Sequence, residues 1–488
     1  MRNRHANRYP GCRCDLPSAT YQFSFAPYAD WPQFYSYAED IKKYFKIFAE
    51  KFHIVSHIRL RRKVTAAVYD AASGAWDVTV QNLETLQMRT ETYDIFAPAT
   101  GVLSNVNRPF IPGLESFTKT PVLHTAEWPH CAEKSISAVI GVGCSGLQTI
   151  GTIAPHCKTL DVYARTKFWI IPPVGAVDTL KEQEERTLFI ERPETLYKHL
   201  KEISSSINTL YGSWSPSRLL NQRKLAKPTS PDFLRRDSVG QMCRRATPGA
   251  AFFEALKLPN VTFINDPIKK ITPNGIVTEK GVERPVDRLI LATGFDTSFK
   301  PRYRLRGKDG IDLRDAWSQR PKAYLSIAVA GFPNMFFIGC GPGITYANGP
   351  FLTCVEAQAD YVVACLSKLQ KQDLKSMEVD RDVQEEYNIQ QESLMKDLIW
   401  SDPCASWYKG GKVDGEPDAL YAGSTLQFME TLASPRWEDW KFVPLYQNRF
   451  SFLGNGESSI EASGGDRAYY ITMEDAKNAL KASDYKAD

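Results

Sequence analysis

The pattern of apolar and polar positions changes period several times along the chain, and the clearest change begins near residue 136. Residues 138–140 are apolar without a break, which predicts a buried strand of a parallel sheet. Residues 147–154 place apolar side chains at helical spacing, and Pro155 ends the predicted helix. A second apolar stretch, residues 160–163, predicts the next strand. Strand, helix and strand in this order predict an α/β unit built on a parallel sheet.

Other stretches extend this α/β pattern over most of the chain. Residues 38–52 and 353–369 carry apolar side chains at helical spacing, which predicts two amphipathic helices. Residues 64–70 and 76–81 predict two strands joined by a turn at Ser73-Gly74. Further short elements are expected at residues 252–256, 261–264 and 275–277. Residues 174–236 are charged, helical in pattern and without a strand signal, which predicts a helical insertion.

One short pattern occurs twice. Residues 93–97 and residues 287–291 each predict a strand, and each strand leads into Ala-Thr-Gly, at 99–101 and at 292–294. Two strands with this ending predict two nucleotide-binding halves, in which each glycine lies where the chain passes close to a cofactor.

Three glycines follow the strand at 138–140 with the spacing G-x-G-x-x-G. Gly141 permits a tight turn, Gly143 lets the backbone approach a pyrophosphate, and Gly146 lets the helix pack close to the strand. The start of the helix offers N–H groups and the positive end of a dipole to phosphates. A glycine turn in some other α/β protein is the alternative, but the strands and helix around it favour dinucleotide binding. The remaining candidate residues of this site are Val142, Cys144, Ser145 and Leu147.

The end of the second strand indicates which dinucleotide binds. NAD-binding proteins usually carry an acidic residue about 20 positions beyond the glycines. This chain has Ala164-Arg165-Thr166-Lys167 there, and cations suit the 2′-phosphate of NADPH. We therefore expect Arg165 and Lys167 to favour NADPH over NADH, with a solvated basic strand end as the alternative.

Composition excludes several other classes of function. Of 488 residues, 43% are hydrophobic and 24% charged, and the formal net charge of +4 is small and scattered. Neither nucleic-acid binding nor membrane insertion is expected from such a surface. The ten cysteines show no zinc-site spacing, and the N-terminus lacks the apolar core of a signal peptide. We expect a cytoplasmic enzyme with no metal site and infer no protein partner.

Taken together, several motifs resemble those of the Baeyer–Villiger monooxygenases, a family of flavoproteins that insert an oxygen atom next to a ketone. The resemblance spans nearly the whole sequence. It rests on the segments N-R-Y-P-G-C-R-C-D at 7–15 with Tyr21, G-V-G-C-S-G-L-Q at 141–148, C-R-R at 243–245, A-T-G-F-D at 292–296, G-F-P-N at 331–334 and S-W-Y-K at 406–409.

This resemblance implies FAD and NADPH as cofactors, with a ketone and O₂ as substrates, and a role in secondary-metabolite biosynthesis. Arg245 would be the catalytic cation that stabilises the anionic oxygen species formed on the reduced flavin, because a guanidinium stays charged at any relevant pH. Asp15 would lie beside it and set its position. Arg244 and Trp407 would hold the nicotinamide cofactor. The resemblance also implies that Arg165 and Thr166 belong to the NADPH site. Further cofactor-binding residues implied by the resemblance are Arg13, Cys14, Tyr21 and Val64.

The expected fold is α/β, with two Rossmann-like nucleotide-binding domains and a helical insertion. The family begins with a strand–G-x-G-x-x-G–helix that seats FAD, and no such unit precedes Asn7, so the FAD domain is expected to be incomplete at its N-terminus. The expected parts are FAD domain 1–131, NADP domain 132–180, helical insertion 181–239, NADP domain 240–290, and FAD domain with C-terminal tail 291–488.

Two other functions fit the same motifs. A flavin enzyme that hydroxylates nitrogen or sulfur would depend less on Arg245. A degenerate relative would bind NADPH without catalysis. The missing N-terminal unit favours this last alternative, whereas the presence of Asp15, Arg244, Arg245 and Trp407 favours a working Baeyer–Villiger monooxygenase.

Overall fold

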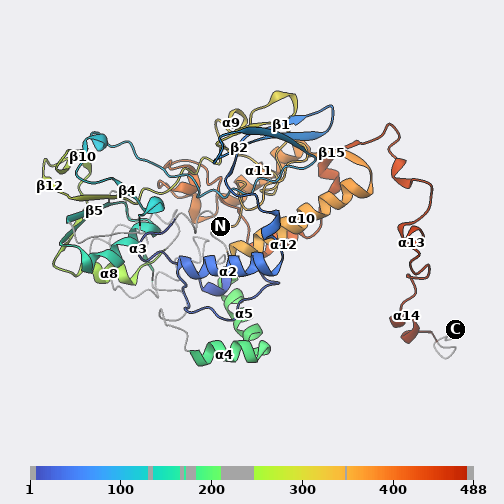
Figure 1. Ribbon diagram of the computed structural model, residues 1–488, viewed down its shortest axis with the longest axis horizontal. Helices are drawn as coiled ribbons and strands as arrows, with labels where there is room; N and C mark the ends of the chain where they lie inside the picture. The colour runs from blue at the N-terminus through green and yellow to red at the C-terminus, as the bar shows by residue number, and fades with distance from the viewer. Residues whose placement is uncertain are drawn as a thin grey trace.

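A five-stranded parallel sheet forms the part of the molecule at the left of Figure 1. The computed structural model describes residues 7–129, 136–164, 170–171, 183–209, 247–346 and 349–480. The strand order is β4 (Leu123–His124), β13 (Arg288–Leu291), β5 (Ile136–Ile140), β6 (Thr159–Tyr163) and β9 (Val261–Ile264), and every neighbouring pair is parallel. The strand, helix and strand predicted between residues 138 and 163 are therefore confirmed.

Each face of this sheet is covered by a different layer. Helices α3 (Cys144–Ile153) and α8 (Ala250–Leu256) pack on one face, where Val139, Val162 and Ile290 are buried with them. Side chains alternate along a strand, so the neighbouring residues Ala138 and Leu289 enter the other face. That face packs against an antiparallel sheet formed by β10 (Ile268–Ile271), β11 (Gly275–Thr278) and β12 (Glu283–Pro285).

A second sheet lies at the top of Figure 1 and has the order β14, β1, β2, β3. Its strands are β14 (Arg304–Arg306), β1 (Arg62–Asp70), β2 (Ala75–Asn82) and β3 (Met88–Tyr93). The predicted hairpin of β1 and β2 is confirmed, with Gly74 in the left-handed region at φ 78°. The strand predicted at 93–97 is wrong: β3 ends at Tyr93 because the chain leaves β2, and only Phe96 makes an isolated bridge, to Met335.

A third core contains the second helix predicted from the sequence. Helix α10 (Phe351–Lys371) packs on the antiparallel pair β15 (Leu374–Val379) and β16 (Trp440–Pro444), with α12 (Thr425–Leu432) beside it. Helix α11 (Arg381–Met395) contributes Val383 and Tyr387 to the same core. Shorter elements are α9 (Leu313–Ala316) and the parallel pair β7 (Ile170–Ile171) and β8 (Thr247–Pro248).

Helices near the N-terminal segment form the lower part of the view in Figure 1. Helix α2 (Ala38–Lys51) buries Ile41 and Tyr44 against an aromatic cluster. Helices α4 (Gln183–Glu191) and α5 (Pro193–Asn208) agree with the helical character predicted for the insertion. In the described part of the chain, no helix has the length and apolar character needed to cross a membrane.

The C-terminal segment leaves the body of the molecule after β16 (Figure 1). It carries the short helices α13 (Ser459–Ala462) and α14 (Met473–Lys477). No residue from 445 to 480 is buried. This segment therefore adds nothing to the three cores.

Candidate functional site

A large cavity of about 1580 Å³ lies beyond the carboxyl ends of two parallel strands. The segment 142–145 follows β5, the segment 292–300 follows β13, and both line the cavity. The Ala-Thr-Gly segments at 99–101 and 292–294, predicted to pass close to a cofactor, line the same space. Ligands of open α/β sheets bind at this edge, and pockets for drug-sized ligands occupy only about 300–1,000 Å³. The cavity thus offers more room than one small substrate needs.

The three glycines build one wall of this cavity in the way that their spacing predicts. Gly141 is in the left-handed region at φ 105°, and a Cβ there would lie 2.6 Å from the carbonyl oxygen of Ala292. A Cβ on Gly146 would lie 2.2 Å from the carbonyl oxygen of Gly141. Gly143, in contrast, is exposed and has open space where a Cβ would be. Gly141 and Gly146 therefore bring strand and helix together, while Gly143 faces the cavity.

The start of helix α3 completes this wall. Gly143 is the N-cap residue and supplies no side-chain cap, so the helix presents its first turn to the cavity. Cys144, Ser145 and Leu147 line the cavity with Val142. Hydrogen bonds hold the turn from both sides: Thr125 Oγ1 to Ser145 Oγ at 3.2 Å, and Cys144 Sγ with the hydroxyl of Thr247 at 3.1 Å. A helix start of this kind can bind a pyrophosphate.

The N-terminal segment lies against the same helix. The hydroxyl of Tyr21 donates to Oδ1 of Asp15 at 2.7 Å, and both residues line the cavity. Gln148 of α3 accepts from the hydroxyl of Tyr9 at 2.9 Å and from the backbone N–H of Arg13 at 3.3 Å. Its amide also donates to the carbonyl oxygen of Arg13 at 3.2 Å. The structure therefore joins two motifs that are more than a hundred residues apart in the sequence.

Trp407 reaches the cavity from the C-terminal part of the chain. It begins a short turn of 3₁₀-helix, Trp407–Lys409, whose N-cap Ser406 accepts a hydrogen bond from the N–H of Tyr408. The indole ring packs against Tyr346, with ring centres 5.6 Å apart. These contacts hold the indole of Trp407 at the cavity wall.

Lys409 of the same turn is buried and lines the cavity. Its ammonium donates to the carbonyl oxygens of Asp402 at 2.6 Å and Val413 at 2.8 Å. Burial lowers the pKa of Lys409, and the nearby Asp414 opposes this shift. Lys409 thus joins the two sides of the loop that contains Trp407, at Asp402 and at Val413.

Two groups near the cavity, the partly buried Tyr346 and the buried His124, are held in their neutral forms. Burial raises the pKa of the Tyr346 hydroxyl far above its usual value. Burial also lowers the pKa of His124, at the end of β4, whose Nδ1 accepts a hydrogen bond from the N–H of Ala126 at 3.1 Å. Neither side chain therefore contributes a charge to the site.

Not every predicted site residue lies at the cavity. Cys14 is buried in the aromatic cluster with Trp31 and Tyr44, on the side of its segment away from the cavity. Val64 lies in β1 and packs at the edge of the second sheet's core, so its predicted role in cofactor binding stays a prediction. Arg165, Thr166, Arg244 and Arg245 lie outside the described residues.

Sequence reasoning missed three residues that matter to this geometry. Gln148 ends the segment G-V-G-C-S-G-L-Q, and its long amide side chain in the first half of the predicted helix was a usable signal. Lys409 also stood in a motif, but nothing in the sequence shows that its ammonium is buried. Tyr346 had no signal, because its contacts with Trp407 arise only in the fold.

Known proteins share sequence similarity with most of this chain. Residues 18–303 match the family described as flavin-binding monooxygenase-like. An FAD-binding monooxygenase of Emericella nidulans is 32% identical over 489 residues, which cover 95% of this chain and 80% of that protein. A Baeyer–Villiger monooxygenase of Pseudomonas aeruginosa is 31% identical over 443 residues, covering 86% of this chain and 81% of that protein.

The fold itself also has solved counterparts. The crystal structure of cyclohexanone monooxygenase from Rhodococcus sp. Phi1 bound to NADP⁺ superposes with a TM-score of 0.76 at 22% identity, covering 91% of this chain and 92% of that one. This likeness confirms the α/β fold with Rossmann-like units. From its sequence relatives and the match over residues 18–303, the chain belongs to the flavin-binding monooxygenase-like family, as its resemblance to the Baeyer–Villiger monooxygenases predicted.

Proposed function

We propose that this flavin monooxygenase uses FAD, NADPH and O₂ to insert an oxygen atom next to the carbonyl of a ketone. One observation carries the proposal: Asp15, Gly143 and Trp407 come from three widely separated motifs and line a single cavity. The relatives named as FAD-binding and as Baeyer–Villiger monooxygenases support the same activity. A place in secondary-metabolite biosynthesis stays a prediction.

The cavity fits both cofactors. For NADPH, the exposed Gly143 and the uncapped start of α3 provide the close backbone approach that a pyrophosphate needs. For FAD, the two Ala-Thr-Gly segments line the same cavity as the N-terminal segment, and their small side chains would allow a flat ring system to approach the backbone. When bound, the pair would supply hydride transfer and activation of O₂.

The chain's own residues would orient the reacting groups. Tyr21 fixes the carboxylate of Asp15 at the cavity wall, where that carboxylate can hold a guanidinium in place. The resemblance to the Baeyer–Villiger monooxygenases implies that this guanidinium is Arg245, whose permanent charge would stabilise negative charge as it develops during the reaction. Trp407 would contact the nicotinamide nucleotide through its indole, which Tyr346 supports from behind.

The test supplies purified, FAD-loaded protein with NADPH, ¹⁸O₂ and a panel of cyclic and aryl ketones. Ester or lactone that carries one ¹⁸O atom is expected. Amines and sulfides serve as competing substrates, and oxidation of these alone would replace the proposal with hydroxylation of nitrogen or sulfur. NADP⁺ binding without oxidation of any of them would indicate a relative without catalysis.

A substitution of Arg245, the predicted catalytic cation, tests the proposed reaction directly. Arg245→Ala should stop ester formation while NADPH oxidation continues with release of H₂O₂, since losing one preorganised charge contact costs about 2.7–4 kcal/mol, roughly 10²–10³ in rate. Arg244→Ala, next to it, should instead weaken NADPH binding. An Arg245→Ala enzyme that still couples NADPH use to ester formation would remove Arg245 from the reaction.

A further inference from the structure

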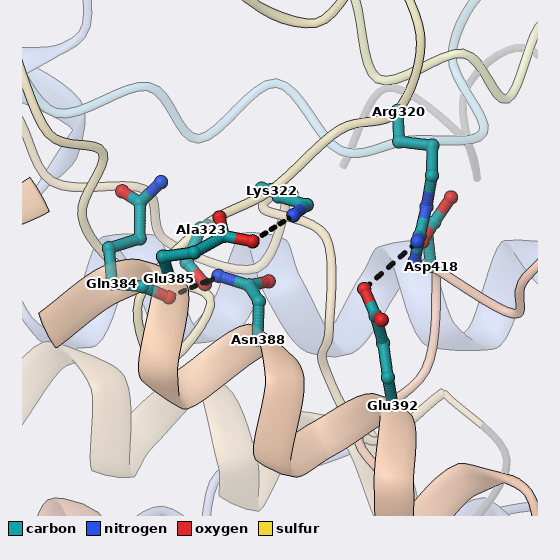
Figure 2. A network of polar contacts seen from close by, with 8 residues as sticks. All are labelled: Arg320, Lys322, Ala323, Gln384, Glu385, Asn388, Glu392 and Asp418. Atoms are coloured by element: carbon teal, nitrogen blue, oxygen red, sulfur yellow. Dashed lines mark hydrogen bonds and ion pairs between the residues drawn. The ribbon is translucent and has the colours of Figure 1, made fainter. Parts of the chain in front are cut away.

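The wall between the cavity and helix α11 contains one arginine between two carboxylates. Figure 2 shows Arg320 pointing between Asp418 and Glu392, which come from a C-terminal loop and from α11. Its Nε donates to Oδ1 of Asp418 at 3.0 Å, and its Nη1 donates to Oε1 of Glu392 at 2.9 Å. A guanidinium is planar and has several donors in a fixed fork, so it can hold two carboxylates in fixed directions at once.

This arrangement is only partly exposed to water. The side chain of Asp418 is 17% exposed, and those of Arg320 and Glu392 are each 32% exposed. Burial raises the pKa of Asp418, and the guanidinium of Arg320 opposes that shift. Removing the arginine would therefore leave two adjacent carboxylates, one of them largely buried, without their cation, which is more costly than losing an exposed ion pair.

The loop that carries Arg320 is attached to α11 at further points. Lys322 forms an ion pair with Glu385 at 2.6 Å, and the amide of Asn388 donates to the carbonyl oxygen of Ala323 at 3.4 Å (Figure 2). Helix α11 in turn packs into the third core. Arg320 is thus held by a rigid part of the molecule, and it extends from there to the cavity, which it also lines.

Asp418 connects this anchor to the turn of Trp407. The next residue, Ala419, donates its N–H to the carbonyl oxygen of Tyr408 at 3.3 Å, and Tyr408 follows Trp407 directly. The carbonyl oxygen of Asp418 accepts from the N–H of Gly343 at 2.9 Å. Lys409 holds the loop around Trp407 together from within. Two polar contacts lead from the Asp418 segment to α11: the ion pair of Asp418 with Arg320, and the hydrogen bond from the N–H of Ala422 to Oε1 of Gln391 at 2.9 Å. Of these two, the contact with Arg320 lies nearer in sequence to the hydrogen bond between Ala419 and Tyr408.

We propose that Arg320 is a positioning residue: through Asp418 it holds the turn of Trp407 against helix α11, and so sets the affinity of the enzyme for NADP⁺ and NADPH. The effect on affinity rests on the proposed role of Trp407 in nucleotide binding. The anchoring of the turn does not, and it can be measured without nucleotide.

The first measurement is amide hydrogen exchange of residues 406–411 in the full chain without nucleotide. Arg320→Ala and Asp418→Ala should each accelerate exchange there by about tenfold, since exchange reports local opening. The double variant should exchange no faster than either single one, because both remove the same link. Lys322→Ala is the matched control: it breaks a neighbouring ion pair to the same helix and should leave exchange within about twofold. Arg320→Lys keeps the positive charge but loses the planar guanidinium that contacts both carboxylates. It should accelerate exchange by a smaller factor, and it replaces Arg320→Ala if that variant does not fold.

The second measurement is titration with NADP⁺. Arg320→Ala should weaken binding about tenfold, which corresponds to 1.4 kcal/mol, while Lys322→Ala should not. In a Trp407→Ala background the Arg320→Ala change should have no further effect. An equal loss in both backgrounds would overturn the proposal, because Arg320 would then act independently of Trp407.

The two measurements separate the two ideas. If Trp407→Ala binds NADP⁺ as the wild type does, the proposed role of Trp407 fails, and exchange at 406–411 alone decides the anchoring. Unchanged exchange in both Arg320→Ala and Arg320→Lys would overturn the anchoring, even if nucleotide binding by Trp407 were established.

Discussion

The same substitution at two glycines three positions apart should weaken NADP⁺ binding in both cases but lower the stability of the fold in only one. In Gly146→Ser the new Cβ would lie 2.2 Å from the carbonyl oxygen of Gly141 and 3.3 Å from the Cβ of Ala292. The first contact is with backbone at the end of a buried strand, so α3 must move away from the sheet. Overpacking of this kind costs about 1–3 kcal/mol. In Gly143→Ser the new Cβ enters open space, and serine is a favourable N-cap residue. The free energy of unfolding should therefore change by less than about 0.5 kcal/mol.

The assay pairs the apparent melting temperature with calorimetric titration of NADP⁺. Gly146→Ser should lower the melting temperature, at about 2–4 °C for each kcal/mol in a domain of 150–250 residues, and weaken NADP⁺ binding as α3 moves. Gly143→Ser should melt as the wild type does yet bind NADP⁺ at least about tenfold more weakly, because its side chain occupies the space for the pyrophosphate.

Either of two results would refute this reasoning. A Gly146→Ser protein with unchanged melting and binding would mean that the close contact of strand and helix is not needed. Normal NADP⁺ affinity in Gly143→Ser would mean that no phosphate approaches the backbone at that point of the cavity wall.

Three further predictions concern single side chains. Arg165→Ala should reduce the preference for NADPH over NADH by about 1–3 kcal/mol, measured as the ratio of the two dissociation constants. Tyr21→Phe removes the hydrogen bond to Asp15 and should lower kcat for ketone oxygenation by an amount equivalent to roughly 0.5–1.5 kcal/mol, with an unchanged melting temperature. Burial lowers the pKa of folded His124 below its ordinary value of 6.5, so the unfolded chain takes up the proton first and stability falls as the pH drops through that value. Between pH 7.5 and 5.5 the melting temperature should fall less in His124→Gln than in the wild type, whereas the exposed control His156→Gln should fall as the wild type does. An equal fall in both variants would contradict this.

The sequence predicts those parts of the site whose residues lie close together in the sequence. Strand β5, the three glycines and helix α3 follow one another within 18 residues, so their spacing is enough to predict the turn between strand and helix. The resemblance to a known family then brought in Asp15 and Trp407, which no local pattern connects to the glycines. Their meeting in one cavity is a property of the fold.

Other features could not be predicted because their partners are far apart in the sequence. Arg320 contacts residues 72 and 98 positions away, and nothing in the surrounding sequence distinguishes it from a surface arginine. The strand expected at 93–97 failed for a related reason. Its apolar residues suit a strand, but Phe96 is only partly buried and its backbone pairs with Met335 instead of extending β3.

The position of β13 has a consequence for how the chain folds. This strand lies between β4 and β5, although it is made about 150 residues after them. Until Arg288–Leu291 emerges during synthesis, β5 keeps an unpaired edge of apolar residues, and such edges template association between chains. Long-range pairing of this kind is also slow. Fragments that end before Arg288 should therefore aggregate, and the nucleotide-binding wall forms only once the chain has been made well beyond its midpoint.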